Sequence, residues 1–228
     1  MPPPMATPPC PLCQADQPAW HYDASDAPSR PHARYTCCAV CGLVSMHPAD
    51  RPSRTAEHAH YALHENCPDD PGYRRFLAKL ADPLVPKLPA HAHGLDYGSG
   101  PGPTLSLMLE AQGLPMTLYD PAFAPDPDAL RRRYEFITCT ETAEHFHNPA
   151  AEFARLDALL RPAGWLAVMT EMLQPGQPFA DWWYRRDSTH VCFYQPRTMH
   201  WLATRFRWQA EHPHPNVTLF HKPAERGD

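Results

Sequence analysis

Two pairs of cysteines near the start of the chain have the spacing of zinc ligands. Cys10 and Cys13 enclose two residues, and so do Cys38 and Cys41. Two such pairs supply four thiolates, which is the soft tetrahedral ligand set of structural zinc sites. We therefore expect these four cysteines to bind one structural Zn²⁺ with no open position for catalysis. Redox activity of each pair is the alternative interpretation, and Cys37 is a neighbour that could replace Cys38.

A glycine-rich turn, Gly98-Ser-Gly-Pro-Gly102, lies between a short apolar stretch and a helical pattern. Glycines there let the backbone turn sharply and approach a ligand, and the start of the helix offers unpaired N–H groups. The spacing lacks the third glycine of the dinucleotide fingerprint, which favours a nucleoside. Asp96 precedes the turn, and Asp120 ends the next strand pattern, where a carboxylate can accept ribose hydroxyls.

Four motifs in order extend this pattern. They are Asp96–Gly102, Asp120, Tyr134–His145 and Leu160–Val168. Because of these motifs, residues 73–223 resemble the class I S-adenosylmethionine-dependent methyltransferases. The resemblance implies an α/β fold with a Rossmann-like seven-stranded sheet whose last strand is antiparallel. The segment before it, which contains the two cysteine pairs, is expected to form a small zinc ribbon. It implies S-adenosylmethionine as cofactor, contacted by Asp96, Gly98, Ser99, Gly100, Gly102, Asp120, Pro121 and Glu141. The sequence departs from the family at residues 121–128, where prolines and aspartates interrupt the usual third strand, so the adenine contact is unassigned.

Acidic and histidine side chains follow the fourth-strand motif, where the methyl group is expected. His145 could act as a general base that Glu144 orients, and His190 is a further catalytic candidate. Alternatively, His145 caps the helix that begins near Pro149. Methyl transfer from a sulfonium is an in-line displacement, so the protein mainly aligns the acceptor. A base is needed only if the acceptor arrives protonated.

An aromatic segment, residues 179–194, follows the fifth-strand motif, where the family usually inserts acceptor-binding elements. Aromatic rings and arginine suit a flat or anionic acceptor. We therefore expect substrate contacts from Trp182, Trp183, Tyr184, Arg185 and Tyr194. The alternative interpretation is a packed core segment in which His190 fixes a turn.

Hydrophobic periodicity predicts the elements that position these residues. It indicates helices over 73–81, 104–112, 150–160 and 197–205, and strands over 95–97, 116–119, 135–140, 165–170, 208–211 and 217–221. Short strands near 35–37 and 43–46 flank the second cysteine pair. We expect three parts: a zinc-ribbon-like module over 1–47, a linker over 48–72 and the methyltransferase domain over 73–228.

Composition and net charge indicate which class of molecule the protein acts on. The formal net charge is −5, whereas a protein that tracks phosphates is usually basic. We therefore expect a small-molecule acceptor rather than nucleic acid. The alternatives are an RNA or protein methyltransferase that docks its substrate on the ribbon, and a scaffold that binds cofactor without chemistry. No apolar run is long enough to span a membrane, and the start lacks a signal-peptide pattern, so we expect a cytoplasmic protein with reduced cysteines.

Overall fold

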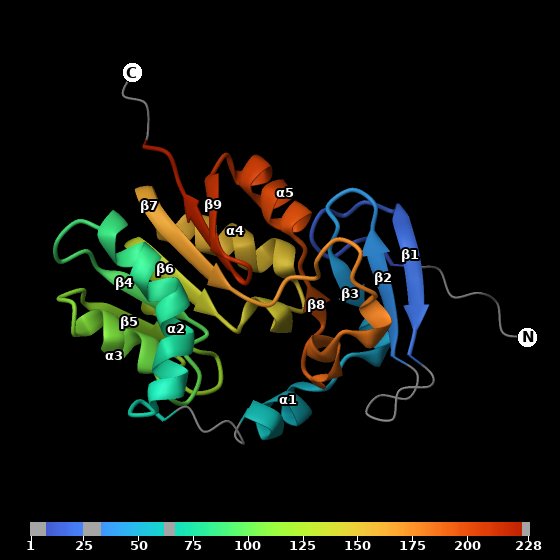
Figure 1. Cartoon of the computed structure of the whole chain (residues 1–228), viewed down its shortest axis with the longest axis horizontal. Coiled ribbons are helices and arrows are strands. Elements are labelled where there is room, and N and C mark those ends of the chain that lie inside the picture. Colours follow the sequence, from blue (N-terminus) through green and yellow to red (C-terminus); the bar gives the residue numbers. More distant parts are fainter. Residues whose placement is uncertain (1–7, 25–32, 62–66, 225–228) are drawn as a thin grey trace, which may run out of the picture.

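The computed structural model describes residues 8–24, 33–61 and 67–224. These residues form a six-stranded mixed sheet and a four-stranded antiparallel sheet. Figure 1 shows the two sheets next to each other, with helix α1 (Arg54–Tyr61) at the lower edge of the view. Among the described helices, none has the length and apolar character needed to cross a membrane.

The larger sheet has the order β5-β4-β6-β7-β10-β9. Its strands are β4 (Gly94–Tyr97), β5 (Met116–Tyr119), β6 (Tyr134–Thr140), β7 (Leu160–Met169), β9 (Gln209–His214) and β10 (Val217–His221). Strands β4 to β7 are parallel, and β10 is antiparallel to both of its neighbours. The predicted α/β fold with an antiparallel final strand is therefore confirmed.

The predicted number of strands is wrong, because the described residues form six strands in this sheet rather than seven. The missing strand is the third of the family pattern. After Asp120 the chain turns back at once, with a bridge between Asp120 and Ala124, and continues through a short 3-10 helix, η3 (Ala129–Arg131). Prolines in residues 121–128 lack the N–H groups that a sheet ladder needs, so this segment cannot extend the edge at β5.

Helices cover both faces of the larger sheet. They are α2 (Pro71–Leu84), α3 (Thr104–Glu110), α4 (Pro149–Leu159) and α5 (Pro196–Phe206). Because successive strand residues point to opposite faces, Phe136 packs with the buried residues of α2 and α3, whereas Ile137 packs with those of α4 and α5. Figure 1 shows α2 and α3 on the near side of this sheet.

Helix α2 extends further than the sequence predicts. Asp70 caps its start by accepting a hydrogen bond from the N–H of Gly72 at 2.7 Å. Pro83, two residues beyond the predicted end of the helix at residue 81, lies inside it. The buried side chains of Leu80 and Leu84 hold the last turn against the sheet, which offsets the hydrogen bond that proline cannot make.

The smaller sheet joins the amino-terminal part of the chain to the segment that follows β7. It consists of β1 (Pro18–Asp23), β2 (Arg34–Cys38), β3 (Val44–Met46) and β8 (Cys192–Phe193), in that order. Val44 of β3 pairs with Phe193 of β8, so the expected module of residues 1–47 shares its sheet with the segment after β7. The rings of Tyr35, Phe179 and Phe193 contact one another beneath this sheet, with centroids 5.1–5.9 Å apart.

The remaining short elements are 3-10 helices: η1 (Pro48–Asp50), η2 (Val85–Lys87), η4 (Ala143–His145), η5 (Phe179–Asp181) and η6 (Trp183–Arg186). Two of them, η4 after β6 and η6 after β7, bring polar side chains to the end of the sheet. Helix α1 lies in the segment that we expected to be a mostly irregular linker.

Candidate active site

The four cysteines predicted as zinc ligands converge on one point. The Sγ atoms of Cys10 and Cys41 are 3.5 Å apart, and those of Cys13 and Cys38 are 3.4 Å apart. All four sulfur atoms lie within 4.8 Å of one another. Tetrahedral zinc with bonds of about 2.3 Å separates its sulfur ligands by about 3.8 Å. The arrangement therefore fits a structural zinc ion.

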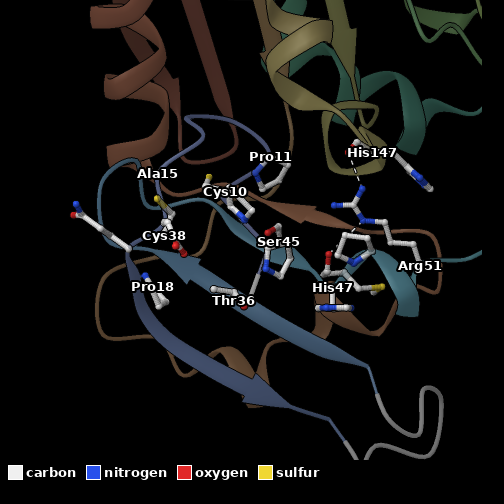
Figure 2. A pocket seen from close by; sticks show the side chains of 16 residues that line it. Cys10, Pro11, Ala15, Pro18, Thr36, Cys38, Ser45, His47, Arg51 and His147 are labelled. Atoms are coloured by element: carbon white, nitrogen blue, oxygen red, sulfur yellow. Dashed lines mark hydrogen bonds between the residues drawn. The ribbon is translucent and has the colours of Figure 1, made fainter. Parts of the chain in front are cut away.

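Figure 2 shows Cys10 and Cys38 at one side of a small cavity of about 150 Å³, with Arg51 and His147 at the other. Arg51 donates a hydrogen bond to the carbonyl oxygen of His147 at 2.7 Å, which ties the cysteine-rich part to the segment after β6. Cys37 points elsewhere: the amide of Gln195 lies 3.6 Å from its Sγ atom. The structure thus places Cys38, and not Cys37, in the cluster.

A much larger cavity of about 1260 Å³ lies where β4, β5 and β6 end. Ligand pockets usually have volumes of about 300–1000 Å³, so this cavity has room for two ligands side by side. The glycine turn and Asp120 line it, as do α1, the start of α2, the residues after β6 and part of the aromatic segment. Crevices at the carboxyl ends of parallel strands are the usual ligand sites of such sheets.

The glycine turn requires glycine for two separate reasons. Gly98 and Gly100 have positive φ angles of 83° and 61°, a region that residues with a side chain rarely adopt. A Cβ atom on Gly98 would also lie 2.2 Å from the Cγ2 atom of Thr142. The hydroxyl of Thr142 donates to the carbonyl oxygen of Gly98 at 3.2 Å, so the turn and the segment after β6 are in direct contact.

Asp96 is buried below the turn and connects three elements. Its carboxylate accepts hydrogen bonds from Ser106 of α3 at 2.9 Å and from Thr138 of β6 at 2.8 Å. Burial raises the pKa of Asp96, although these two hydrogen bonds act in the opposite direction. Both carboxylate oxygens already have protein donors, so Asp96 stabilises the turn by connecting β4 to α3 and β6.

Asp120 holds the turn from the other side. Its Oδ2 atom accepts from the N–H of Gly100 at 3.0 Å, and its Oδ1 atom accepts from the N–H groups of Ala122 and Phe123. A carboxylate oxygen can accept two hydrogen bonds, so Oδ2 retains capacity for one more donor. Pro121 follows as an exposed residue on the cavity wall.

Four buried polar atoms around this cavity have no hydrogen-bond partner among the described residues. They are Ser99 Oγ, Thr104 Oγ1, Thr140 Oγ1 and Glu141 Oε1. Buried polar atoms are nearly always paired in folded proteins, so their gathering at one cavity indicates a polar ligand. Hydroxyls and a carboxylate suit a ligand with both anionic and cationic groups. The methionine part of S-adenosylmethionine carries both, so the cavity fits that cofactor.

A network of hydroxyl and carboxyl groups lies behind Glu141. Tyr184 donates to Glu144 at 2.5 Å and lies 3.4 Å from Glu141, and Thr170 donates to Glu144 at 2.9 Å. Burial raises the pKa of Glu141, and the nearby carboxylate of Glu144 raises it further. Burial likewise raises the pKa of Tyr184, so this phenol keeps its proton and remains a hydrogen-bond donor.

The three predicted catalytic residues lie together in the cavity wall. The nearest ligand atoms of Glu144, His145 and His190 are within 4.8 Å of one another, and the two imidazole rings meet edge to face at 4.9 Å. The alternative that His145 caps the following helix is wrong, because Asn148 caps α4. His190 is buried, and this burial lowers its pKa.

The predicted substrate residues separate into two groups. Trp183, whose side chain is 62% exposed, and Tyr184 line the cavity. Trp182, Arg185 and Tyr194 are not among the residues that line it. Trp182 and Tyr194 are buried, and the guanidinium of Arg185 lies over the ring of Tyr22 in β1. Those three residues support the packed-core interpretation of the segment.

A family model described as a methyltransferase domain matches residues 70–212. The chain belongs to this methyltransferase family. The match spans the larger sheet from the start of α2 to β9, and it includes the whole of the glycine turn and every predicted catalytic residue.

Several solved methyltransferase structures are similar to the chain. A Burkholderia thailandensis 1,6-didemethyltoxoflavin-N1-methyltransferase with bound S-adenosylhomocysteine has 18% identity and a TM-score of 0.49, covering 91% of this chain and 99% of that one. CalO1, a methyltransferase in calicheamicin biosynthesis, has 14% identity and a TM-score of 0.47, covering 67% of this chain but only 55% of that one. Human N-acetylserotonin methyltransferase in complex with SAM has 11% identity and a TM-score of 0.49, covering 75% and 55%. Similarity at this level carries no information about substrate, and no curated protein sequence matches the chain significantly.

Helix α1 supplies cavity residues of this methyltransferase that the sequence analysis assigned to a linker. His58 stacks on Phe123 with centroids 5.5 Å apart, and Tyr61 meets His145 edge to face at 5.1 Å. Glu57 is buried and lies 2.6 Å from the Nε2 atom of His147. The burial of Glu57 follows from its contact with His147, which is distant in the sequence, so no local pattern in α1 predicts it.

Proposed function

We propose that this methyltransferase transfers a methyl group from S-adenosylmethionine to a small-molecule acceptor in the large cavity. The observation that carries the proposal is the set of unpartnered polar atoms next to the glycine turn. Their residues line the same cavity as Asp96, Asp120 and the predicted catalytic cluster. A cofactor bound there would be adjacent to an acceptor.

The residues of the turn would hold the cofactor. Ser99 and Thr104 offer hydroxyl groups, and the open position on Asp120 Oδ2 suits a ribose hydroxyl. Glu141 offers a carboxylate to a cationic group. The bound cofactor supplies a methyl group on a sulfonium leaving group, so the chain's own task is to align the acceptor and exclude water.

The other end of the cavity would receive the acceptor. Glu144, His145 and His190 line this end, and Trp183 and Tyr61 lie beside them. A general base is available there: the Nδ1 atom of His145 is engaged with the carbonyl oxygen of Thr189 at 3.0 Å, which leaves Nε2 to accept a proton from an acceptor. Helix α1 supplies part of the cavity wall beside these groups.

Charge favours a small acceptor over nucleic acid. Residues 1–47 contain two basic residues, Arg30 and Arg34. Arg30 lies outside the described residues, and the guanidinium of Arg34 is paired with Asp50 at 2.7 Å. The cysteine-rich part therefore presents little positive charge to a phosphate backbone. We assign it a structural zinc ion on Cys10, Cys13, Cys38 and Cys41, and we assign the protein to the cytoplasm.

A methyl-transfer screen tests the proposal. The full-length protein would be incubated with S-adenosylmethionine that carries an isotopically labelled methyl group and, separately, with the small-metabolite, RNA and protein fractions of a cell extract. We expect label to appear in one small molecule, with equimolar release of S-adenosylhomocysteine. Label that appears only in RNA or protein fractions, or no consumption of cofactor above a heat-denatured control, would contradict the proposal.

A further inference from the structure

The cluster of Glu144, His145 and His190 has the composition of a metal site. Their side chains offer one carboxylate oxygen and two imidazole nitrogens, all within 4.8 Å of one another and all at the cavity wall. Two histidines with one carboxylate, with coordination positions left open, form a recurrent ligand set for catalytic divalent transition metals. The four-cysteine cluster is a separate, all-sulfur site.

Hydrogen bonds hold both histidines in the tautomer whose Nε2 atom can bind a metal. The Nδ1 atom of His145 lies 3.0 Å from the carbonyl oxygen of Thr189, and that of His190 lies 2.8 Å from the carbonyl oxygen of Tyr184. A carbonyl oxygen only accepts hydrogen bonds, so both Nδ1 atoms carry the proton. In each neutral ring the lone pair is then on Nε2. Metal-bound histidines are oriented by this type of hydrogen bond.

The Nε2 atoms face acidic groups at distances too long for hydrogen bonds. Nε2 of His145 is 3.9 Å from Glu144 Oε1, and Nε2 of His190 is 3.9 Å from Asp187 Oδ2. Adjacent ligands of one ion, with bonds of about 2.1 Å, are about 3.0–3.4 Å apart. Nε2 of His145 and Oε1 of Glu144 would therefore have to move closer by about 0.5–0.9 Å to share one ion.

Glu144 is also prepared to act as an anionic ligand. Its side chain is buried, and the hydroxyl groups of Tyr184 and Thr170 orient its two oxygen atoms. Ligating carboxylates usually have such outer hydrogen bonds. Asp187 brings a further carboxyl group beside His190, and its Oδ2 atom also lies 3.2 Å from Nε2 of His60.

We propose that Glu144, His145 and His190 bind one divalent transition-metal ion, whose open positions face the cavity and take an oxygen or nitrogen atom of the acceptor. The metal-binding part stands on the geometry alone, whereas the role toward the acceptor rests on the proposed function. A metal-bound hydroxyl group loses its proton more readily. The acceptor's proton would then leave to solvent water, because Nε2 of His145 would be a metal ligand and no longer a general base.

Manganese titration tests the site, because Mn²⁺ favours oxygen ligands such as the carboxylate of Glu144 and does not favour the thiolates of the cysteine cluster. Free Mn²⁺ would be measured by electron paramagnetic resonance during titration of the full-length protein with its zinc retained. We expect one Mn²⁺ per chain, and binding weakened by at least about tenfold in Glu144→Gln, His145→Gln and His190→Gln. His200→Gln, at an exposed position on α5, is the matched control and should bind like the wild type.

Circular dichroism and S-adenosylhomocysteine binding on the same samples separate the outcomes. Wild-type protein that binds S-adenosylhomocysteine but no Mn²⁺ up to millimolar concentration would overturn the metal site and leave the proposed function intact. Protein that binds Mn²⁺ with the expected variant pattern but no S-adenosylhomocysteine would support the metal site and contradict the proposed function. Equal Mn²⁺ binding by the wild type and all folded variants would also overturn the site.

Discussion

The backbone N–H of Gly100 donates a hydrogen bond to Oδ2 of Asp120 at 3.0 Å, which joins the glycine turn after β4 to the end of β5. Two further N–H groups, from Ala122 and Phe123, bind the other oxygen of the same carboxylate. One side chain thus fixes the shape of the cavity wall and still offers a position to a ligand. The consequences for binding and for stability can be measured separately.

Replacing Asp120 should weaken both the fold and cofactor binding. Asp120→Ala leaves three N–H groups without their acceptor, and hydrogen bonds to charged groups contribute about 1.5–3 kcal/mol each. We expect a lower melting temperature and at least about tenfold weaker binding of S-adenosylhomocysteine. Asp120→Asn, which keeps one carbonyl oxygen, should recover most of the stability but not the affinity. Exposed Asp181→Ala is the control, and Asp120→Asn binding at wild-type strength would contradict the assignment.

Removing the hydroxyl of Ser99 should affect binding alone. This oxygen is buried and has no partner among the described residues, and a buried unpaired polar group costs about 1–3 kcal/mol. We expect Ser99→Ala to leave the free energy of urea unfolding unchanged or increase it, while S-adenosylhomocysteine binding weakens about fivefold to tenfold. Ser188→Ala, at an exposed position, should change neither quantity. A loss of stability without a loss of affinity would show that Ser99 has a structural role only.

Gly98 and Gly113 form a matched pair for the steric argument. Both have positive φ angles, 83° and 79°, but a Cβ atom on Gly98 would collide with Thr142, whereas one on Gly113 has nothing within 4 Å. Gly113→Ala should therefore lose only the conformational contribution, about 1 kcal/mol. Gly98→Ala should lose clearly more, about 3 kcal/mol or above, since overpacking adds to strain. Equal losses in chemical denaturation would contradict the close contact with Thr142.

The cysteine cluster should contain one zinc ion per chain. We expect metal analysis of reduced protein to give a ratio near one, and Cys13→Ser to reduce it strongly because a structural site needs all four thiolates. Since β8 completes the small sheet, loss of zinc should also change the fluorescence of buried Trp182. Cys67→Ser, at an exposed position, should retain zinc. A wild-type ratio near zero would remove the zinc assignment.

Asp96 predicts a specific dependence of stability on pH. Its pKa in the folded protein is raised above 3.8 by burial, so the folded state holds a proton that the unfolded state releases. The unfolding free energy should therefore fall as the pH rises from 3.8 through the raised pKa, and then stay level. Asp96→Asn should remove this decline, so the stability of the variant relative to the wild type should rise as the pH rises through the raised pKa. The exposed Asp181→Asn variant should follow the wild-type profile, and an Asp96→Asn profile identical to it would contradict the argument.

Much of the larger sheet follows from local sequence patterns. Strands β4 to β7 and helices α2 to α5 appear close to their expected positions because apolar periodicity and the glycine turn are local signals. Contacts between segments that are distant in the chain could not be predicted from local sequence patterns. Nothing local pairs Val44 with Phe193, and nothing local brings Tyr61 of α1 to His145. For the same reason, the sequence predicts Trp182 and Tyr194 as substrate contacts, whereas the structure buries both side chains.

Binding of S-adenosylhomocysteine, measured by isothermal titration calorimetry on the full-length protein, tests the central claim most directly. The cavity at the ends of β4 to β6, its unpartnered polar atoms and the open position on Asp120 all predict one binding site per chain, with affinity reduced in Ser99→Ala and Asp120→Asn. Absence of binding at millimolar ligand by folded, zinc-loaded protein would contradict the account.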